Sequence, residues 1–141
     1  MVRALMAVAP LVLMLAGQAA AADLSVEVGG LSGSAGQVLV ALHNTSDTFP
    51  SGWSEAVAVE RVPASTPVVV VRFRNLSPGR YAVIVVHDAD GNGRMTKTWI
   101  GLPLEGFGAS NNPGVFGPPR FGKASFEFSG DRTLVIRLVY L

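Results

Sequence analysis

Oxygen-bearing side chains stand at alternate positions in the stretch HDADGNGRM, residues 87–95. Asp88, Asp90 and Asn92 have the one-three-five spacing with which a calcium-binding loop supplies its first ligands. Gly93 follows at the sixth position, where such a loop bends sharply. Because Ca²⁺ prefers carboxylate and amide oxygens, the spacing predicts a calcium site here.

The pattern matches only the first half of a calcium loop. Position twelve, where a bidentate carboxylate closes such a loop, is Trp99. Glu105, from the segment that follows, is the carboxylate that could complete the site. The alternative is a turn without metal, because Asp, Asn and Gly tolerate left-handed backbone and hydrogen-bond their own backbone. The sequence is compatible with both.

His87 precedes Asp88 and offers a different chemistry. An imidazole within reach of a carboxylate can act as a general base, so a small periplasmic hydrolase using His87 with Asp88 or Glu105 is the alternative function. The second histidine, His43, ends another predicted strand, and the chain has no cysteine. Separated histidines without cysteine are weak evidence for zinc, and no residue is assigned a catalytic role.

Residues 98–123 combine many glycines and prolines with aromatic residues. Because disordered linkers are poor in aromatics, we expect this segment to pack on the domain as a long ordered loop. Long ordered loops often carry function, which predicts a surface for a protein, peptide or carbohydrate ligand. The alternative is that the aromatic rings are buried and only anchor the loop. The predicted surface comprises His87, Trp99, Phe107, Ser110, Asn111 and Asn112.

The candidate site residues must be positioned by the fold. Short runs that are apolar, or that alternate apolar and polar residues, occur along the chain and are separated by Gly, Pro, Asn and Ser. With no amphipathic helical window, they predict an all-β fold: a single antiparallel Greek-key sandwich of about seven strands, prealbumin- or immunoglobulin-like. Residues 80–86 are apolar on both faces and should be central. Gly79, after Pro78, should supply the positive φ of a type II turn. The predicted strands are residues 24–28, 36–42, 56–62, 67–74, 80–86, 126–128 and 134–141.

The first 22 residues have the anatomy of a secretory signal peptide: a basic start at Arg3, an apolar stretch, and small residues ending at Ala22. Cleavage after Ala22 leaves residues 23–141 as one domain. The apolar run is shorter than the roughly 20 residues that span a membrane, so no anchor is expected after cleavage. We expect a bacterial periplasmic or secreted protein.

The charge balance and the absence of cysteine limit the partners and the sources of stability that the protein can have. The chain has 11 Lys and Arg against 10 Asp and Glu, and Arg3 leaves with the leader, so the mature charge is near zero. This balance does not favour nucleic acid as a partner. Without cysteine, stability must come from burial, or from burial plus a bound ion.

Several stretches together resemble one family. HDADGNG (87–93), IGLPLEGFGASNN (100–112), PPRF (118–121) and the strand-turn-strand FRNLSPGRYAV (73–83) resemble the bacterial exported proteins grouped as domain of unknown function 2141. The resemblance covers essentially the whole mature chain. It implies a small exported β-sandwich, similar to prealbumin-like modules, with no assigned activity. Family members commonly carry an Asp where this chain has Thr96, which removes one potential ligand.

The sequence thus favours a non-enzymatic exported binding or structural module over a hydrolase. Its candidate cofactor is Ca²⁺, and the candidate ligands are Asp88, Asp90, Asn92 and Glu105.

Overall fold

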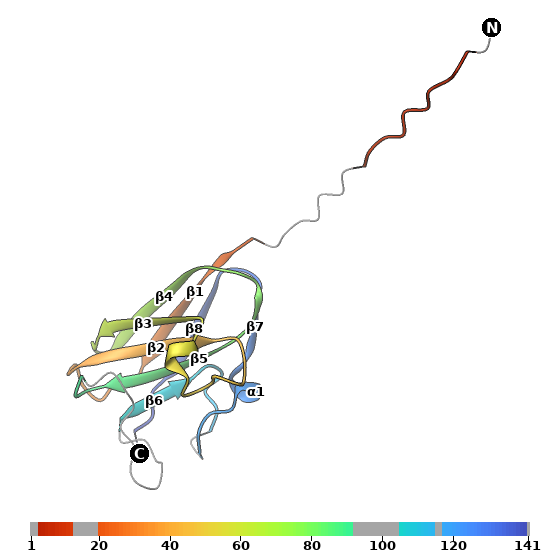
Figure 1. Ribbon diagram of the computed structural model, residues 1–141. Helices are drawn as coiled ribbons and strands as arrows, with labels where there is room; N and C mark the ends of the chain where they lie inside the picture. The colour runs from red at the N-terminus through yellow and green to blue at the C-terminus, as the bar shows by residue number, and fades with distance from the viewer. Residues whose placement is uncertain (1–2, 13–19, 92–104, 115–116, 141) are drawn as a thin grey trace.

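The computed structural model describes residues 3–12, 20–91, 105–114 and 117–140, and its elements are strands with two short helical turns (Figure 1). The strands are β1 (Ala22–Gly29), β2 (Gln37–His43), β3 (Ala58–Pro63), β4 (Val68–Leu76), β5 (Gly79–Asp88), β6 (Gly106–Ala109), β7 (Phe126–Phe128) and β8 (Arg132–Arg137). The helical turns are η1 (Trp53–Glu55) and α1 (Phe121–Ala124).

The strands form two sheets, which confirms the predicted all-β fold. One sheet has the order β4-β1-β8, and the other has the order β3-β2-β5-β6, with β7 paired to the first residues of β5. β1 and β8 run parallel, whereas the other strand pairs in the described residues are antiparallel. The prediction of purely antiparallel sheets is wrong at this pair. Parallel neighbours need a crossover, and here the whole second sheet lies between them in the chain.

Burial follows the predicted strand faces. In β4, Val69, Val71 and Phe73 are buried while the residues between them face water, the alternation expected of a sheet covered on one side. β5 lies between β2 and β6 and is buried over nearly its whole length, which confirms its central position. The main core lies between the two sheets, where inward side chains of both interdigitate.

A second, smaller core lies on the other face of the five-stranded sheet. Ala41 of β2 and Ala82 of β5 alternate with main-core residues and therefore point away from it. Phe49 and the half-buried Trp53, from the connection between β2 and β3, cover this face. Phe121 of α1 packs beside them. The smaller core thus covers the outer face of this sheet over β2, β5 and β6.

The segment predicted as a long loop contains a strand. β6 pairs with residues 84–87 of β5, so the loop prediction is wrong for Gly106–Ala109. Its sequence, GFGA, lacks a strand signal because glycine is depleted in strands. The glycines are needed because β8 and the chain after it pass close: a Cβ on Gly106 would lie 2.4 Å from the Tyr140 ring, and one on Gly108 would lie 2.8 Å from Ile136 of β8. In the rest of the described segment, Phe121 packs against the smaller core, whereas most residues of 111–114 and 117–123 are exposed.

The turn before β5 differs from its prediction. Positive φ occurs at Asn75, at 59°, and Gly79 is outside the left-handed region. Gly79 already pairs with Phe128, and the Tyr81 hydroxyl donates a hydrogen bond to the Ser77 carbonyl at 2.7 Å. Asparagine tolerates this backbone because its short polar side chain can hydrogen-bond locally.

Residues 3–12 belong to neither sheet and extend away from both (Figure 1). Their large apolar side chains are exposed, with Leu5 at 96% and Leu11 at 87%. Among the described residues, no helix is long and apolar enough to cross a membrane.

Candidate functional site

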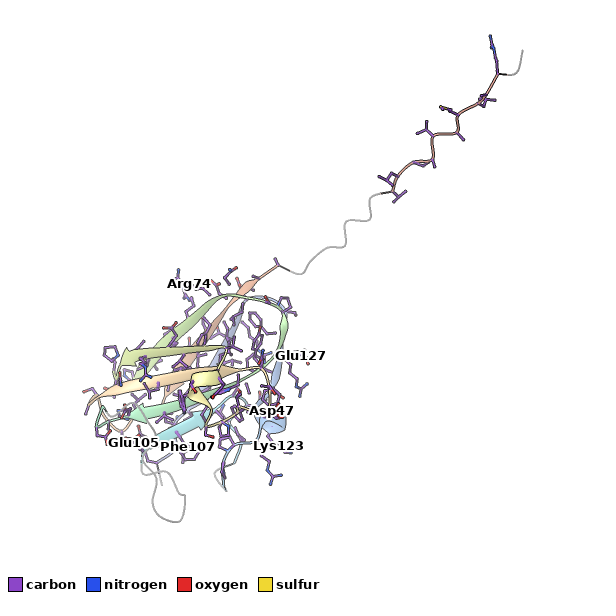
Figure 2. The ribbon with its side chains drawn as sticks, in the orientation of Figure 1. Asp47, Arg74, Glu105, Phe107, Lys123 and Glu127 are labelled. Carbon is purple, nitrogen blue, oxygen red and sulfur yellow. The ribbon has the colours of Figure 1, made fainter. Side chains whose placement is uncertain are left out.

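Three carboxylates meet where β5 ends and β6 begins. Asp88 is the last residue of β5, and Asp90 follows two residues later. Glu105 comes beside them because β6 runs antiparallel to β5 with Gly106 opposite His87. One oxygen from each carboxylate lies within 4.8 Å of the other two. We call Asp88, Asp90 and Glu105 the carboxylate cluster; Figure 2 shows Glu105 next to Phe107 at its end of β6.

The cluster combines burial with concentrated negative charge. Asp88 is fully buried and Glu105 is 8% exposed, whereas Asp90 faces solvent. Ionised carboxylates at this separation repel one another, and burial increases the cost because less water screens them. A divalent cation removes this repulsion. Ca²⁺ holds oxygens at about 2.3–2.6 Å, so ligands on opposite sides of the ion are about 5 Å apart, which fits the observed spread.

The surrounding backbone forms the turn that the sequence also allowed. The Gly91 N–H donates to the Asp88 carbonyl at 3.4 Å, and Gly91 has φ 72°. Gly36 packs against the same carbonyl, where a Cβ would lie only 2.1 Å from the oxygen. The carboxylate cluster is thus built on a turn. Asn92 and Trp99 lie outside the described residues.

Gln37 is a part of the site that the sequence did not single out. Its Nε2 donates to Asp88 Oδ2 at 3.2 Å, across the β2–β5 pair. The sequence could have pointed to Gln37 because it is a polar residue at the start of a mostly apolar strand. An open cavity of about 410 Å³ adjoins it, with Arg61 as the charged residue in its lining. The cavity is lined by Gly36, Gln37, Arg61, Val62, Pro63 and Gly91.

His87 lies inside the sandwich and is 2% exposed. Its Nε2 is 2.7 Å from the Ala35 carbonyl, which can only accept, so this nitrogen carries a proton. Its Nδ1 is 2.7 Å from the Tyr140 hydroxyl, whose oxygen also accepts from the Ser32 N–H. Both ring nitrogens are therefore used inside the protein. A general base needs a nitrogen that faces substrate, so this geometry gives the hydrolase alternative no support.

The other end of β6 holds Ser110, Asn111 and Asn112, which we call the Ser-Asn-Asn turn. Ser110 is fully buried, and its Oγ accepts from the Val83 N–H at 2.9 Å and donates to the Ala124 carbonyl. One hydroxyl thus joins β5 to the end of α1.

Both asparagines of the Ser-Asn-Asn turn hydrogen-bond to backbone. Asn111 Nδ2 donates to the carbonyls of Lys123 and Ser125, at 3.0 and 2.9 Å. Asn112 accepts from the Arg137 N–H at 2.9 Å and donates to the Val135 carbonyl at 3.0 Å. The Asn112 amide thus occupies the position of a neighbouring strand beside β8.

The predicted binding residues that the structure describes thus divide into three buried residues and the two exposed asparagines, Asn111 and Asn112. His87, Phe107 and Ser110 are buried, and the asparagines hold neighbouring segments together. These positions support the alternative that the loop residues anchor the loop.

His43, the second histidine, is also fully buried. Its Nδ1 lies 2.8 Å from Thr48 Oγ1, and its ring packs edge-on against Phe49 at 5.6 Å. Within the described residues its Nε2 has no hydrogen-bond partner. Desolvation by burial lowers the pKa of His43 below its ordinary value of 6.5. The ring is thus held neutral.

Comparison with known proteins gives the family. The model of a family described as uncharacterized proteins conserved in bacteria, domain of unknown function 2141, matches residues 26–136. The chain belongs to this family, which confirms the resemblance seen in its sequence. Neither the curated proteins nor the solved structures gave a match.

Proposed function

We propose that this family member is an exported, non-enzymatic β-sandwich module that binds Ca²⁺ through the carboxylate cluster. The observation that carries the proposal is the meeting of Asp88, Asp90 and Glu105 within 4.8 Å. Two of these carboxylates are buried, where like charges are most costly and where a divalent cation stabilises the folded state most.

The cavity beside Gln37 supports a binding role next to the ion. A cation that keeps open coordination positions can bind oxygen atoms of a ligand as well as those of the protein. Arg61 stands at the same cavity and adds a positive charge. A protein, peptide or carbohydrate ligand with hydroxyl or carboxylate groups would suit this combination.

Export is supported by the first residues of the chain. The apolar side chains described in residues 3–12 are exposed and take no part in either core. Removal of residues 3–12 would therefore cost neither core any packing, whereas Ala22, which packs against the main core at the start of β1, would be lost with the leader. We therefore propose that residues 1–22 are a cleaved leader and that the domain works in the bacterial periplasm or outside the cell.

We further propose that the two sheets have the Greek-key connectivity of a prealbumin-like domain. The three-stranded and five-stranded sheets that face each other across one main core support this topology.

Thermal unfolding of the exported protein, with EDTA and with millimolar Ca²⁺, tests the calcium site. An ion that binds only the folded state stabilises it by about 2.7 kcal/mol at a hundredfold excess over its dissociation constant. For a domain of this size we expect Tm to rise by about 10 °C. Mg²⁺ should raise it less, because that ion demands near-ideal octahedral geometry.

The matched variants are Asp88→Asn with Asp90→Asn, and Asp47→Asn with Glu60→Gln at exposed positions elsewhere. Both pairs remove two negative charges, but only the first should abolish the Ca²⁺ response. Equal Tm values in EDTA and in saturating Ca²⁺ would rule out the site.

A further inference from the structure

The backbone nitrogen of Asp23 meets a carboxylate. Asp23 N lies 2.8 Å from Asp131 Oδ1. Asp131 directly precedes β8, and the parallel register of β1 with β8 begins one residue later, with Leu24 opposite Arg132. A side-chain oxygen therefore accepts the N–H at the point where strand pairing begins.

Asp23 is also fixed on its other side. Its own Oδ1 accepts from the N–H of Asn75, near the end of β4, at 3.0 Å. The register between β1 and β4 is irregular between Ala22 and Leu24 and regular from Leu24 onward. Asp23 therefore contacts both neighbours of β1 just before the regular pairing starts.

Hydrolysis of the bond between Ala22 and Asp23 would change the chemistry at this nitrogen. Water adds across the bond, Ala22 keeps the carboxylate, and Asp23 N becomes a free amine whose ordinary pKa is about 7.7–8.0. The neutral amide that now donates to Asp131 would become an ammonium group at the same place. Hydrogen bonds between charged partners are roughly twice as strong as neutral ones.

We propose that the Ala22–Asp23 bond is the processing site and that Asp131 is the carboxylate that receives the new amino terminus. Cleavage would thus lock the start of β1 to the start of β8. This inference rests on the proposed export, and it adds a specific bond and a specific partner residue.

The geometry distinguishes between cleavage sites that the sequence leaves open. Cleavage after Ala21 and cleavage after Ala22 both have a small residue immediately before the cleaved bond and another one two positions further upstream. Only cleavage after Ala22 places the ammonium group against Asp131. One additional residue would move it by about 3.4 Å along the strand, beyond hydrogen-bond distance.

The charged groups around the new terminus determine the sign of its pH dependence. The carboxylates of Asp131 and Asp23 favour the ammonium form, whereas the neighbouring strands carry the cations Arg72 and Arg74 of β4 and Arg132 and Arg137 of β8. Since a carboxylate in direct contact dominates, the folded state holds the proton more tightly than the unfolded chain. The stabilisation is then complete below about pH 7.7 and is lost as the pH rises through the folded-state pKa.

The experiment begins with the full chain expressed in a bacterium that exports it. Intact mass of the recovered protein gives the cleavage position. Thermal unfolding of this protein and of its Asp131→Asn variant is then measured between pH 6.5 and 9.5. The substituted amide would keep an acceptor oxygen but lose the charge, so we expect the Tm of the variant to be lower by about 1–4 °C at pH 6.5 and equal at pH 9.5.

Two controls separate the ion pair from general charge effects. Glu60→Gln removes an exposed carboxylate from β3 and should show no such pH-dependent difference. A chain that begins at Ala22, with its amine one residue away, should lose the pH dependence of the Asp131→Asn effect.

Each outcome decides one claim. A mature protein that begins at Asp23, with a pH-dependent Asp131→Asn effect, supports the proposal. Cleavage at another bond overturns the processing site while leaving export intact. A protein that begins at Asp23 but shows a pH-independent effect overturns the ion pair. Recovery of the full-length mass alone overturns the proposed export as well.

Discussion

The two ends of β6 lie beside polar side chains that the sequence singled out for binding, and the structure uses the two groups differently. At one end, the Ser-Asn-Asn turn hydrogen-bonds to the backbone of β5, β8 and the segment around α1. At the other end, the carboxylate cluster gathers three acids within 4.8 Å. The first arrangement stabilises the fold, and the second concentrates charge that a cation can neutralise.

The difference follows from the hydrogen-bonding capacity of the side chains. Serine and asparagine carry both donors and acceptors, so they can complete backbone groups that strand pairing leaves over. Ionised carboxylates only accept hydrogen bonds, so carboxylates brought close together repel one another. Polar residues in an ordered loop are therefore better candidates for ligand binding when they carry charges of the same sign.

The largest effect should come from breaking the Ser-Asn-Asn turn at Ser110. Ser110→Ala removes the group that bonds the Val83 N–H and the Ala124 carbonyl. Each buried group left without a partner costs about 1–3 kcal/mol, so we expect a total loss of about 2–6 kcal/mol for the two groups. Urea unfolding measures it.

Ser77→Ala, at an exposed serine, is the control for Ser110→Ala and should have little effect. The Ca²⁺ affinity of the Ser110 variant should match that of the parent protein. A Ser110→Ala protein as stable as the parent would contradict the structural role of this turn.

A smaller effect should come from Gln37, the neutral donor beside the carboxylate cluster. Gln37→Ala removes the hydrogen bond to Asp88 Oδ2. Since residues that orient metal ligands typically affect affinity 10- to 100-fold, we expect Ca²⁺ binding to weaken by about tenfold. Calorimetric titration with Ca²⁺ checks this.

Measured together, the two variants test whether the two ends of β6 have different roles. Ser110→Ala should lower stability without changing Ca²⁺ affinity, whereas Gln37→Ala should weaken Ca²⁺ binding. If Gln37→Ala left the Ca²⁺ affinity unchanged, Gln37 would have no part in orienting Asp88.

The smallest effect should be the loss of stability at low pH that comes from His43, in the smaller core beside the Ser-Asn-Asn turn. His43 lies there opposite Ala82, and burial lowers its pKa. Because the unfolded chain binds a proton more readily than the folded one, the contribution of His43 is fully present above about pH 6.5. It is lost as the pH falls through the lowered folded-state pKa.

Urea unfolding midpoints at pH 7.5 and pH 5 should therefore differ, with the lower stability in acid. His43→Gln should reduce this difference. An identical pH dependence in the variant would show that another group is responsible.

Some of the fold could be predicted from local pattern. The alternation Val69-Val71-Phe73 and the two-sided apolar run of β5 placed these strands correctly, because side-chain period is a local property. The sequence did not predict β6, because its glycines are required by close contacts with Tyr140 and Ile136, which are distant in the chain. The parallel neighbour of β1 was missed for the same reason: pairing between β1 and β8 depends on the path of everything between them.

The candidate site divides in the same way. The sequence by itself determined the family, the β pattern and the acidic residues of the 88–90 stretch, because these depend on residue type and short spacing. Only the tertiary structure brought Glu105 and Gln37 to Asp88 and placed both nitrogens of His87 in internal hydrogen bonds. Hydrogen-bond partners and charge proximity are decided by strand register, and register joins residues that the linear spacing keeps apart.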